Sequence, residues 1–230
     1  MEAILLAGGK AERLGDASTG KPKALVPVAG RPLSAYQVHL LAQAGVERVL
    51  VSCAAGREGE FVAALAGIGP EIEAVGEPEP LGRGGGLRLA AAARAENGPV
   101  FALNGDELVD LDLRALLARH EEGAVAATIA VVPLPSSFGV VDIADDDLVT
   151  GFREAPQLPF WASCGVYVLG EDALARLPER GDHERLLFPD LAAERRLRAY
   201  RHEGVWLTVN TPKDLRLADE WMRAHPGWLD

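Results

Sequence analysis

The stretch Leu6-Ala-Gly-Gly-Lys-Ala-Glu-Arg-Leu14, near the start of the chain, decides the fold. It overlaps the continuous apolar run of residues 3–7, and a run without alternation predicts a strand buried on both faces. Gly8 and Gly9 follow, and glycines let main-chain amides approach an anion closely. Open parallel sheets bind ligands at the carboxyl ends of their strands, so this pattern predicts a phosphate-binding site.

Beyond this stretch, the first half of the chain alternates short apolar runs with helical patterns. Further strands are predicted over residues 49–53, 72–75 and 100–103, and helices over residues 33–44, 58–65 and 88–95. Strands that alternate with helices form right-handed βαβ units. The fold class expected is therefore α/β, with a Rossmann-like, doubly wound and mainly parallel sheet.

After residue 123 the pattern changes to strands in quick succession. These are predicted over residues 124–132, 139–143, 148–152 and 165–169, with a hairpin turn over residues 144–147. We expect this region to be a strand-rich extension of the sheet that covers a second face of the ligand site. A last strand over residues 205–209 and a closing helix over residues 211–223 follow, with Thr211 as N-cap and Pro212 at the first position.

Composition limits the ligand and the surroundings of the protein. The chain has 230 residues, which suits one medium domain, and its net charge of −11 argues against a wide nucleic-acid surface. A phosphate ligand should therefore be small and lie in a locally basic pocket. Cys53 and Cys164 form no CxxC motif, and they predict buried free thiols in a reducing compartment. Because neither a signal-peptide pattern nor an apolar run near the ~20 residues of a membrane span occurs, we expect a cytoplasmic protein.

A second phosphate-loop pattern lies downstream but fails at its last position. Residues 15–22 match GxxxxGK[ST] except that Pro22 has neither the hydroxyl for Mg²⁺ nor a backbone N–H. A P-loop must also begin directly at a strand, whereas this strand ends at Ala7. The better interpretation uses Gly8 and Gly9, with the cations Arg13 and Lys23 near the two ends of a long, non-periodic loop.

The spacings LAGGxxxRL and KPKxLxPVxGRPL strongly resemble the signature of the sugar-phosphate nucleotidylyltransferases, or NDP-sugar pyrophosphorylases. Later motifs occur in the family's order, at residues 81–87, 104–106, 138–141, 152–154, 165–167 and 206–211. The resemblance implies one nucleotidyltransferase domain over residues 1–230 with the nucleotide-diphospho-sugar transferase fold. It further implies a nucleotide-binding half (1–123) and a sugar-phosphate-binding half (124–230). Such enzymes join a nucleoside triphosphate to a sugar 1-phosphate and release pyrophosphate.

The resemblance also assigns site residues. It implies that Arg13, Lys23 and Asp106 are catalytic and that Asp106 binds Mg²⁺, the expected cofactor. It implies nucleotide binding by Leu6, Ala7, Gly8, Gly9, Gly82, Gly84, Gly85 and Asn104, and sugar-phosphate binding by Gly139, Glu154, Ser163, Gly165 and Thr208. Three alternatives stay open: Lys21 could take the role of Lys23, Asp106 could cap a helix, and the glycine run could be a tight turn.

The chemistry expected of these residues is an in-line displacement at the α-phosphorus. The attacking sugar phosphate is already an anion, so the reaction needs positioning and charge neutralisation more than a strong base. Gly8 and Gly9 amides would hold phosphate oxygens, Arg13 would bind the leaving pyrophosphate, and Lys23 would lie near the α-phosphate. Asp106 would hold Mg²⁺ together with phosphate oxygens and water.

Several positions depart from the family pattern, and most lie in the acceptor half. Thr208 replaces a second metal-binding aspartate. The family's Glu-Lys-Pro is replaced here by Glu154-Ala155-Pro156, and Arg153 or Lys213 could take the place of the missing lysine. Ser163 replaces an asparagine, and Arg83 replaces a threonine of the glycine loop. Two hypotheses follow, an active transferase with an unusual acceptor pocket and a non-catalytic subunit that senses nucleotides or nucleotide-sugars. Arg13, Lys23 and Asp106 are intact, which favours the enzyme.

The base and the sugar are less well defined by the sequence. Residues 177–191 resemble the mannose-1-phosphate guanylyltransferase and glucose-1-phosphate thymidylyltransferase branches, and we lean to GTP with mannose- or heptose-1-phosphate. The alternative is dTTP or UTP with glucose-1-phosphate. Glu77 or Glu79 could accept hydrogen bonds from guanine, or both could be exposed loop carboxylates. No nucleic-acid or membrane partner is expected, and a homo-oligomer stays open.

Overall fold

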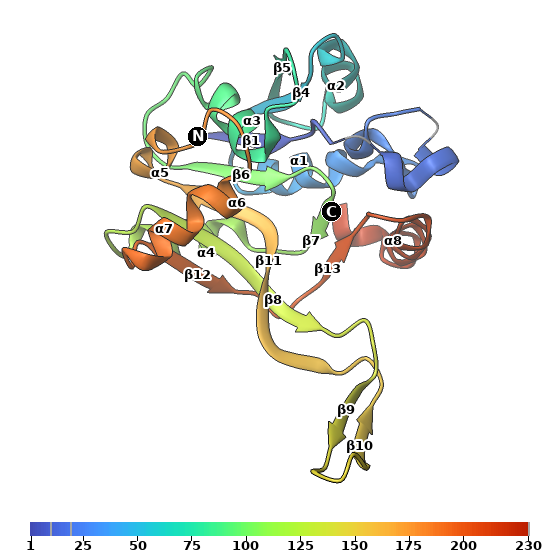
Figure 1. Ribbon diagram of the computed structural model, residues 1–230. Coiled ribbons are helices and arrows are strands. Elements are labelled where there is room, and N and C mark those ends of the chain that lie inside the picture. The colour runs from blue at the N-terminus through green and yellow to red at the C-terminus, as the bar shows by residue number, and fades with distance from the viewer. Residues whose placement is uncertain (10, 19, 230) are drawn as a thin grey trace.

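The computed structural model describes residues 1–9, 11–18 and 20–229, and it is built on one seven-stranded sheet (Figure 1). The strands lie in the order β12 (Leu197–Arg201), β8 (Ala127–Pro135), β11 (Gln157–Leu169), β6 (Val100–Asn104), β1 (Glu2–Leu6), β4 (Arg48–Ala54) and β5 (Glu71–Glu77). Only β11 runs antiparallel to its neighbours. The predicted mixed α/β fold with a mainly parallel sheet is confirmed.

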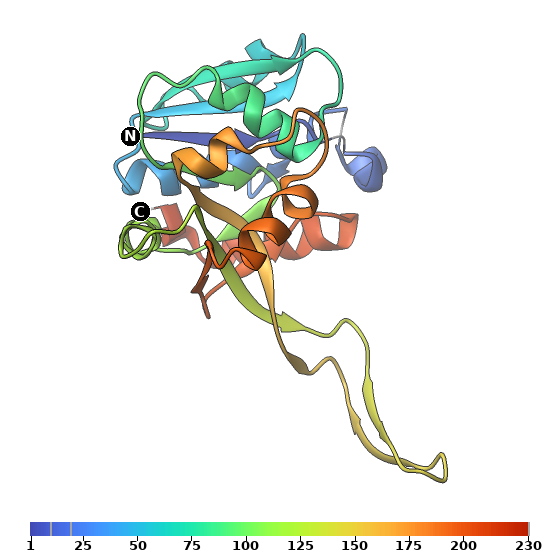
Figure 2. The same ribbon diagram turned by 60° about the vertical axis from the view of Figure 1, so that its left-hand side comes forward.

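Helices cover both faces of this sheet (Figure 2). One buried cluster includes residues of α1 (Leu33–Gln43), α2 (Glu58–Leu65) and α4 (Leu113–Glu121), and the other those of α3 (Gly82–Ala91), α5 (Glu171–Ala175) and α7 (Phe188–Ala193). In β1, Ala3 and Leu5 belong to the first cluster and Ile4 to the second. Both faces of β1 are therefore buried, which explains its unbroken apolar sequence.

A third cluster packs the closing helix against the chain that follows β1. It joins α8 (Pro212–Ala224) to η1 (Glu12–Ser18), β2 (Pro27–Val28) and α1, and η2 (Lys23–Leu25) and β3 (Arg31–Pro32) lie beside it in the chain. Thr211 and Asp214 cap α8 reciprocally, with Pro212 in its first turn as predicted. The last strand, β13 (Trp206–Thr208), pairs with β7 (Glu107–Val109) outside the main sheet.

The second half of the chain extends the sheet only in part. Strands β8, β11 and β12 join it, but β9 (Val140–Ile143) and β10 (Val149–Arg153) pair with each other as a separate hairpin that projects from the body (Figures 1 and 2). The prediction that residues 139–143 and 148–152 extend the sheet is therefore wrong. The tight turn folds these strands onto each other, and a hydrogen bond from Ser136 N to Pro156 O (2.8 Å) closes the base. We call residues 136–156 the arm.

Helix α3 begins six residues before the predicted helix, inside the glycine run. The amides of Gly84 and Gly85 both donate to Gly181 O, at 2.8 and 3.3 Å. A Cβ atom at Gly84 would lie 2.6 Å from Pro178 Cγ and 2.7 Å from His183 N. We call residues 178–183 the strap. The strap packs so closely on the start of α3 that no space is left for a side chain at Gly84.

Other elements carry weaker sequence signals. The short helices α6 (His183–Leu186) and η3 (Pro226–Leu229), together with α4, α5, α7 and β12, were not predicted. Cys53 and Cys164 are buried and free, as expected. In the described part of the chain, no helix combines the length and the apolar character that a membrane crossing requires.

His183, at the end of the strap, is a buried base. Its ring meets Tyr167 and Phe188 edge to face, with centroids 5.2 and 4.9 Å away, and neither ring nitrogen has a hydrogen-bond partner among the described residues. Burial, and secondarily the nearby Arg83 guanidinium, lowers the pKa of His183 to about 4. The folded chain therefore resists protonation of this ring.

The pKa of His183 predicts a loss of stability in acid. Because the unfolded ring binds its proton near pH 6.5 and the folded ring only near pH 4, the free energy of unfolding should fall as pH drops through this window. The full contribution is on the order of 3 kcal/mol. Urea denaturation between pH 4.5 and 7 should show a shallower pH dependence in His183→Phe than in the wild type. The exposed control His225→Gln should behave like the wild type, and equal slopes in all three proteins would contradict the assignment.

Candidate functional site

A cavity of about 850 Å³ lies at the carboxyl ends of β1, β4 and β6, where the loops that follow these strands meet. The predicted site residues that line it are Leu6, Ala7, Gly8, Gly9, Arg13, Lys23, Gly82, Asn104 and Asp106. They come from three parts of the chain, namely the end of β1 with the loop that follows it, the start of α3, and the end of β6 with the turn after it. The sequence therefore located this cavity, although the roles assigned to its residues stay predictions.

The centre of the site is an ion pair between Lys23 and Asp106. Lys23 Nζ donates to Asp106 Oδ2 at 2.5 Å and to Asn210 Oδ1 at 2.7 Å. Lys23 is only 9% exposed, because η2 holds it under the loop that follows β1. Lys21 is exposed and does not line this cavity. The geometry favours Lys23 over Lys21 as the cation that acts in the site.

Asp106 lies in the turn between β6 and β7, beside a second carboxylate, that of Glu107. Burial, together with the neighbouring charge of Asp106, raises the pKa of Glu107 to about 8, although the Trp206 indole N–H donates to Glu107 at 2.8 Å. Glu107 pairs across the ladder with Thr208, the position at which the family pattern expects an aspartate. Glu107 of β7 therefore places an acidic side chain directly opposite Thr208 of β13.

These residues have the oxygen-donor chemistry that Mg²⁺ prefers. Asp106 supplies a carboxylate, and Glu107 would supply a second one once a bound cation displaced the proton that its raised pKa retains. Asn104 Oδ1 is buried at the cavity wall without a hydrogen-bond partner among the described atoms. Within the described ranges, no group of three or more His, Cys, Asp or Glu side chains forms a metal cluster. Such a site would suit a cation that keeps water and substrate oxygens as further ligands.

Glu77 and Glu79 differ in their surroundings. Glu77 is half-buried and accepts hydrogen bonds from Ser52 Oγ (2.7 Å) and Leu81 N (3.2 Å), which fix its carboxylate against the glycines. A Cβ at Gly8 would lie 2.9 Å from Glu77 Oε1. Glu79 instead forms an exposed ion pair with Arg180 at 2.6 Å. Of the two candidates for reading a base, Glu77 is the better ordered.

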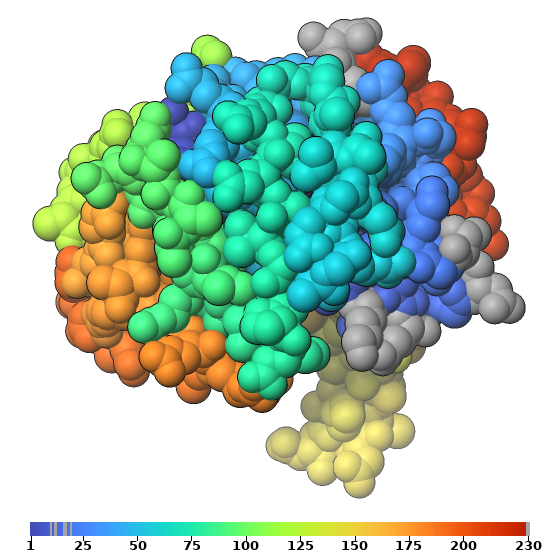
Figure 3. Space-filling model, turned by 90° about the horizontal axis from the view of Figure 1, so that it is seen from above, coloured from blue at the N-terminus to red at the C-terminus, as the bar shows by residue number. Residues whose placement is uncertain are grey.

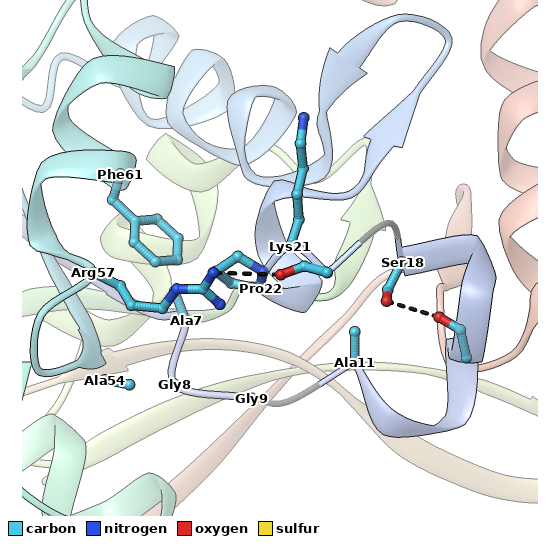
Figure 4. Close-up of a pocket in the computed structure, with 12 residues that line it drawn as sticks. Ala7, Gly8, Gly9, Ala11, Ser18, Lys21, Pro22, Ala54, Arg57 and Phe61 are labelled. Carbon is cyan, nitrogen blue, oxygen red and sulfur yellow. Dashed lines mark hydrogen bonds between the residues drawn. The ribbon is translucent and has the colours of Figure 1, made fainter.

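A smaller cavity of about 300 Å³ also borders the loop after β1 (Figure 4). Lys21, Arg57 and Phe61 line it, and Arg57 donates to Gly20 O at 3.3 Å. Ala7, Gly8, Gly9 and Ala54 border both cavities. The two cavities therefore adjoin each other at these four residues.

The remaining predicted residues lie outside the large cavity. Gly84 and Gly85 are buried against the strap, and Gly139 and Glu154 are on the arm. Ser163 is exposed on β11, and Gly165 lies behind the cavity wall, where a Cβ at Gly165 would meet Asn104 Nδ2 at 2.7 Å. Their binding roles, like that of Thr208, stay predictions.

The sequence did not identify several polar side chains around the site. Arg83, noted only as a departure, forms ion pairs with Asp182 (3.4 Å) and Glu184 (2.6 Å), and Glu184 also accepts from Tyr167 Oη at 2.6 Å. These contacts attach the strap to the start of α3. Glu107, Asn210 and Asp182 also line the cavity. Glu107 directly follows the motif at residues 104–106, whereas Asn210 and Asp182 lie inside the stretches 206–211 and 177–191, where the sequence assigned them no role.

Comparison with known proteins agrees with this geometry. The sequence profile of the family described as "Nucleotidyl transferase" matches residues 2–223. A mannose-1-phosphate guanylyltransferase of Mycobacterium tuberculosis is 32% identical over 225 residues, which cover 93% of this chain and 62% of the relative. A mannose-1-phosphate guanylyltransferase catalytic subunit beta of Danio rerio is 32% identical over 251 residues, covering 100% and 70% respectively. The chain thus spans about two thirds of the length of these curated relatives.

Two solved structures share the fold. HddC from Yersinia pseudotuberculosis, complexed with GMP-PN, matches with a TM-score of 0.74 and 22% identity, over 96% of this chain and 99% of that one. A putative glucose-1-phosphate thymidylyltransferase from Bacillus anthracis, in complex with a sucrose, matches with a TM-score of 0.77 and 20% identity, over 97% of this chain and 96% of that one. With the profile match over nearly all of its length and these relatives, the chain belongs to the nucleotidyl transferase family.

Proposed function

We propose that this protein is a sugar-1-phosphate nucleotidylyltransferase that converts a nucleoside triphosphate and a sugar 1-phosphate into a nucleotide-sugar and pyrophosphate. One observation carries the proposal. The cavity combines the glycine turn after β1, the cations Arg13 and Lys23, and the carboxylate of Asp106. A protein that joins two anionic substrates needs such a combination, because the main barrier is to bring the anions together and to neutralise the leaving group.

Each residue has a physical role in this reaction. The amides of Gly8 and Gly9 lie at the exposed end of β1, where they would hold phosphate oxygens. Lys23 offers a compact positive charge held in place by Asp106 and Asn210. Arg13 is exposed, so its guanidinium is free to close on the leaving pyrophosphate. The attacking phosphate needs no protein base, because it is already ionised.

Mg²⁺ is the cofactor proposed, with Asp106 and Glu107 as the residues that would hold it. When bound, the ion would neutralise charge on the phosphate oxygens. The unpartnered Asn104 Oδ1 supports the fit, since a buried amide oxygen is costly to leave unpaired and accepts from bound water. Lys23 shares Asp106 with this site, so the protein's own cation would orient the carboxylate.

GTP with mannose- or heptose-1-phosphate is the proposed substrate pair. The curated relatives are named for mannose-1-phosphate and guanylyl transfer, which supports this choice. Glu77 also supports it, because its fixed carboxylate has acceptor capacity left after Ser52 and Leu81 for the N–H groups of guanine. A cytoplasmic location belongs to the same proposal, since buried free thiols such as Cys53 and Cys164 suit a reducing compartment.

A non-catalytic sensor of nucleotides is the second candidate. Thr208 and Ala155 stand where the family pattern expects a carboxylate and a lysine, and this favours a weakened acceptor half. Against it stands the buried Lys23–Asp106 pair, which a sensor would have no need to keep.

The deciding experiment combines the protein and Mg²⁺ with each nucleoside triphosphate and a panel of sugar 1-phosphates. Pyrophosphate release is the readout, and we expect the fastest release with GTP and a mannose- or heptose-type acceptor. Release only with dTTP or UTP and glucose-1-phosphate would overturn the substrate proposal. Nucleotide-sugar binding without release for any pair would replace the enzyme with the sensor.

Arg13 should contribute mainly to turnover. We expect Arg13→Ala to lower kcat by at least ~10²-fold, on the scale of losing one preorganised electrostatic group. Steady-state pyrophosphate release measures this effect. The matched control is Lys21→Ala, which removes an exposed cation of the same loop that lies outside the large cavity. A comparable loss in both variants would show that only the loop's total charge matters.

Asp106 should determine the response to the metal. Asp106→Asn keeps the size of the side chain but removes its charge, so the Mg²⁺ concentration for half-maximal activity should rise by roughly 10-fold or more. Mn²⁺ titration followed by electron paramagnetic resonance gives the same comparison without turnover. Asp146→Asn, at the exposed tip of the arm, is the control. Unchanged metal titrations of Asp106→Asn would place the ion elsewhere.

Glu77 should discriminate guanine from hypoxanthine, which lacks the exocyclic amine. We expect the wild type to prefer GTP over ITP, and Glu77→Gln to reduce this ratio of kcat/KM by roughly 10-fold or more. Glutamine keeps the size of the side chain and can still accept from Ser52, but its NH2 group cannot replace the oxygen that accepts from Leu81 N, so circular dichroism should first confirm that the variant is folded. Glu79→Gln, which loses only a surface ion pair, should leave the ratio intact. If Glu79→Gln alone changes the ratio, Glu77 is not the group that reads the base.

A further inference from the structure

The arm has one apolar and one polar face. Cross-strand partners share a face, so the pairs Val141–Phe152 and Ile143–Val149 lie together on one side. The other side carries Asp142 and Arg153, whose ion pair has an N–O distance of 2.7 Å. Such a division is the pattern of a sheet that packs against a second layer on one side.

The apolar side of the arm has no such layer within the described residues, because β9 and β10 pair only with each other and their apolar side chains are exposed. Exposure ranges from 40% at Val141 to 78% at Phe138. The exposed apolar residues on the arm and at its base are Phe138, Val141, Ile143, Leu148, Val149, Phe152 and Phe160. Figures 2 and 3 show the arm extending away from the body, which leaves this surface open. We call these residues the arm surface.

We propose that the arm surface binds the arm surface of a second copy of this chain, so that the protein is a two-fold symmetric dimer. A patch of this kind is larger than single exposed side chains, and it marks an interaction site. Val141, Ile143, Val149 and Phe152 share one face and expose on the order of 100 Å² each, so this face offers roughly 400 Å², about half of the ~800 Å² that each partner buries in a standard interface. The exposed side chains of Phe138 and Phe160 at the base of the arm add to the apolar surface. A two-stranded hairpin is also marginally stable alone, and a second hairpin supplies the missing layer.

A second copy is the occupant that the chemistry favours. The paired residues on this face of the hairpin, Val141, Ile143, Val149 and Phe152, are all uncharged, so two identical faces meet without like-charge repulsion, whereas a charged partner would find nothing to pair with. The turn at the tip holds Asp145, Asp146 and Asp147. An antiparallel arrangement places the two tips at opposite ends and keeps these carboxylates apart. The polar side with Asp142 and Arg153 then faces solvent.

This proposal does not depend on the proposed catalytic function, and its test does not measure turnover. Sedimentation velocity or light scattering on the full chain at about 5–100 µM gives the mass directly. The informative variants are Phe152→Asp and Ile143→Asp, which introduce charge at positions exposed in the single chain. Leu217→Asp on α8 is the matched control, because Leu217 is an exposed apolar residue of the body. Circular dichroism confirms that each variant is folded.

We expect the wild type and Leu217→Asp to have twice the chain mass. Phe152→Asp and Ile143→Asp should have the single-chain mass, with at least ~10²-fold weaker self-association. A wild type that stays monomeric up to 100 µM would overturn the proposal. So would a dimer that persists in both folded arm variants, since its interface must then lie elsewhere.

Discussion

The contact on which the rest of the site depends is the one that Lys23 makes with Asp106 and Asn210. These three residues come from the loop after β1, the turn after β6 and the segment between β13 and α8. Without this contact the loop after β1 would lose the ion pair that connects it to the turn after β6, and α8 would lose one of its links to the sheet. A buried ammonium must be paired, so the requirement for a partner is strict. The same pairing that stabilises the fold also orients the charges that would meet the substrates.

Much of the first half could be predicted because its signals are local. The apolar run of β1 and the helical period of α1 and α2 require only a few neighbouring residues, and Thr211 with Pro212 marks the start of α8. The cavity could also be located, since the carboxyl ends of parallel strands meet at one edge of a sheet. What the sequence could not supply is which side chains of a motif face the cavity.

The glycine run and the arm show why the remaining predictions failed. Glycines in a row are typical of a loop, yet here they begin α3, because the strap lies against them and leaves no space for side chains. That strap is nearly a hundred residues away in the sequence, so no local pattern reports it. In the arm, alternating apolar residues correctly predict strands, but such a pattern is the same for a strand in the main sheet and for one in a separate hairpin.

The central claim is that the turn after β1, with Arg13 and Lys23, holds the polyphosphate of a nucleotide. A crystal structure of the protein with Mg²⁺ and a non-hydrolysable GTP analogue tests it most directly. We expect phosphate oxygens within hydrogen-bond distance of the Gly8 and Gly9 amides, with Arg13 and Lys23 turned toward them. Electron density for the phosphates at another site, with the glycine turn empty and Arg13 in bulk solvent, would show that the polyphosphate binds elsewhere, even though the fold would stand.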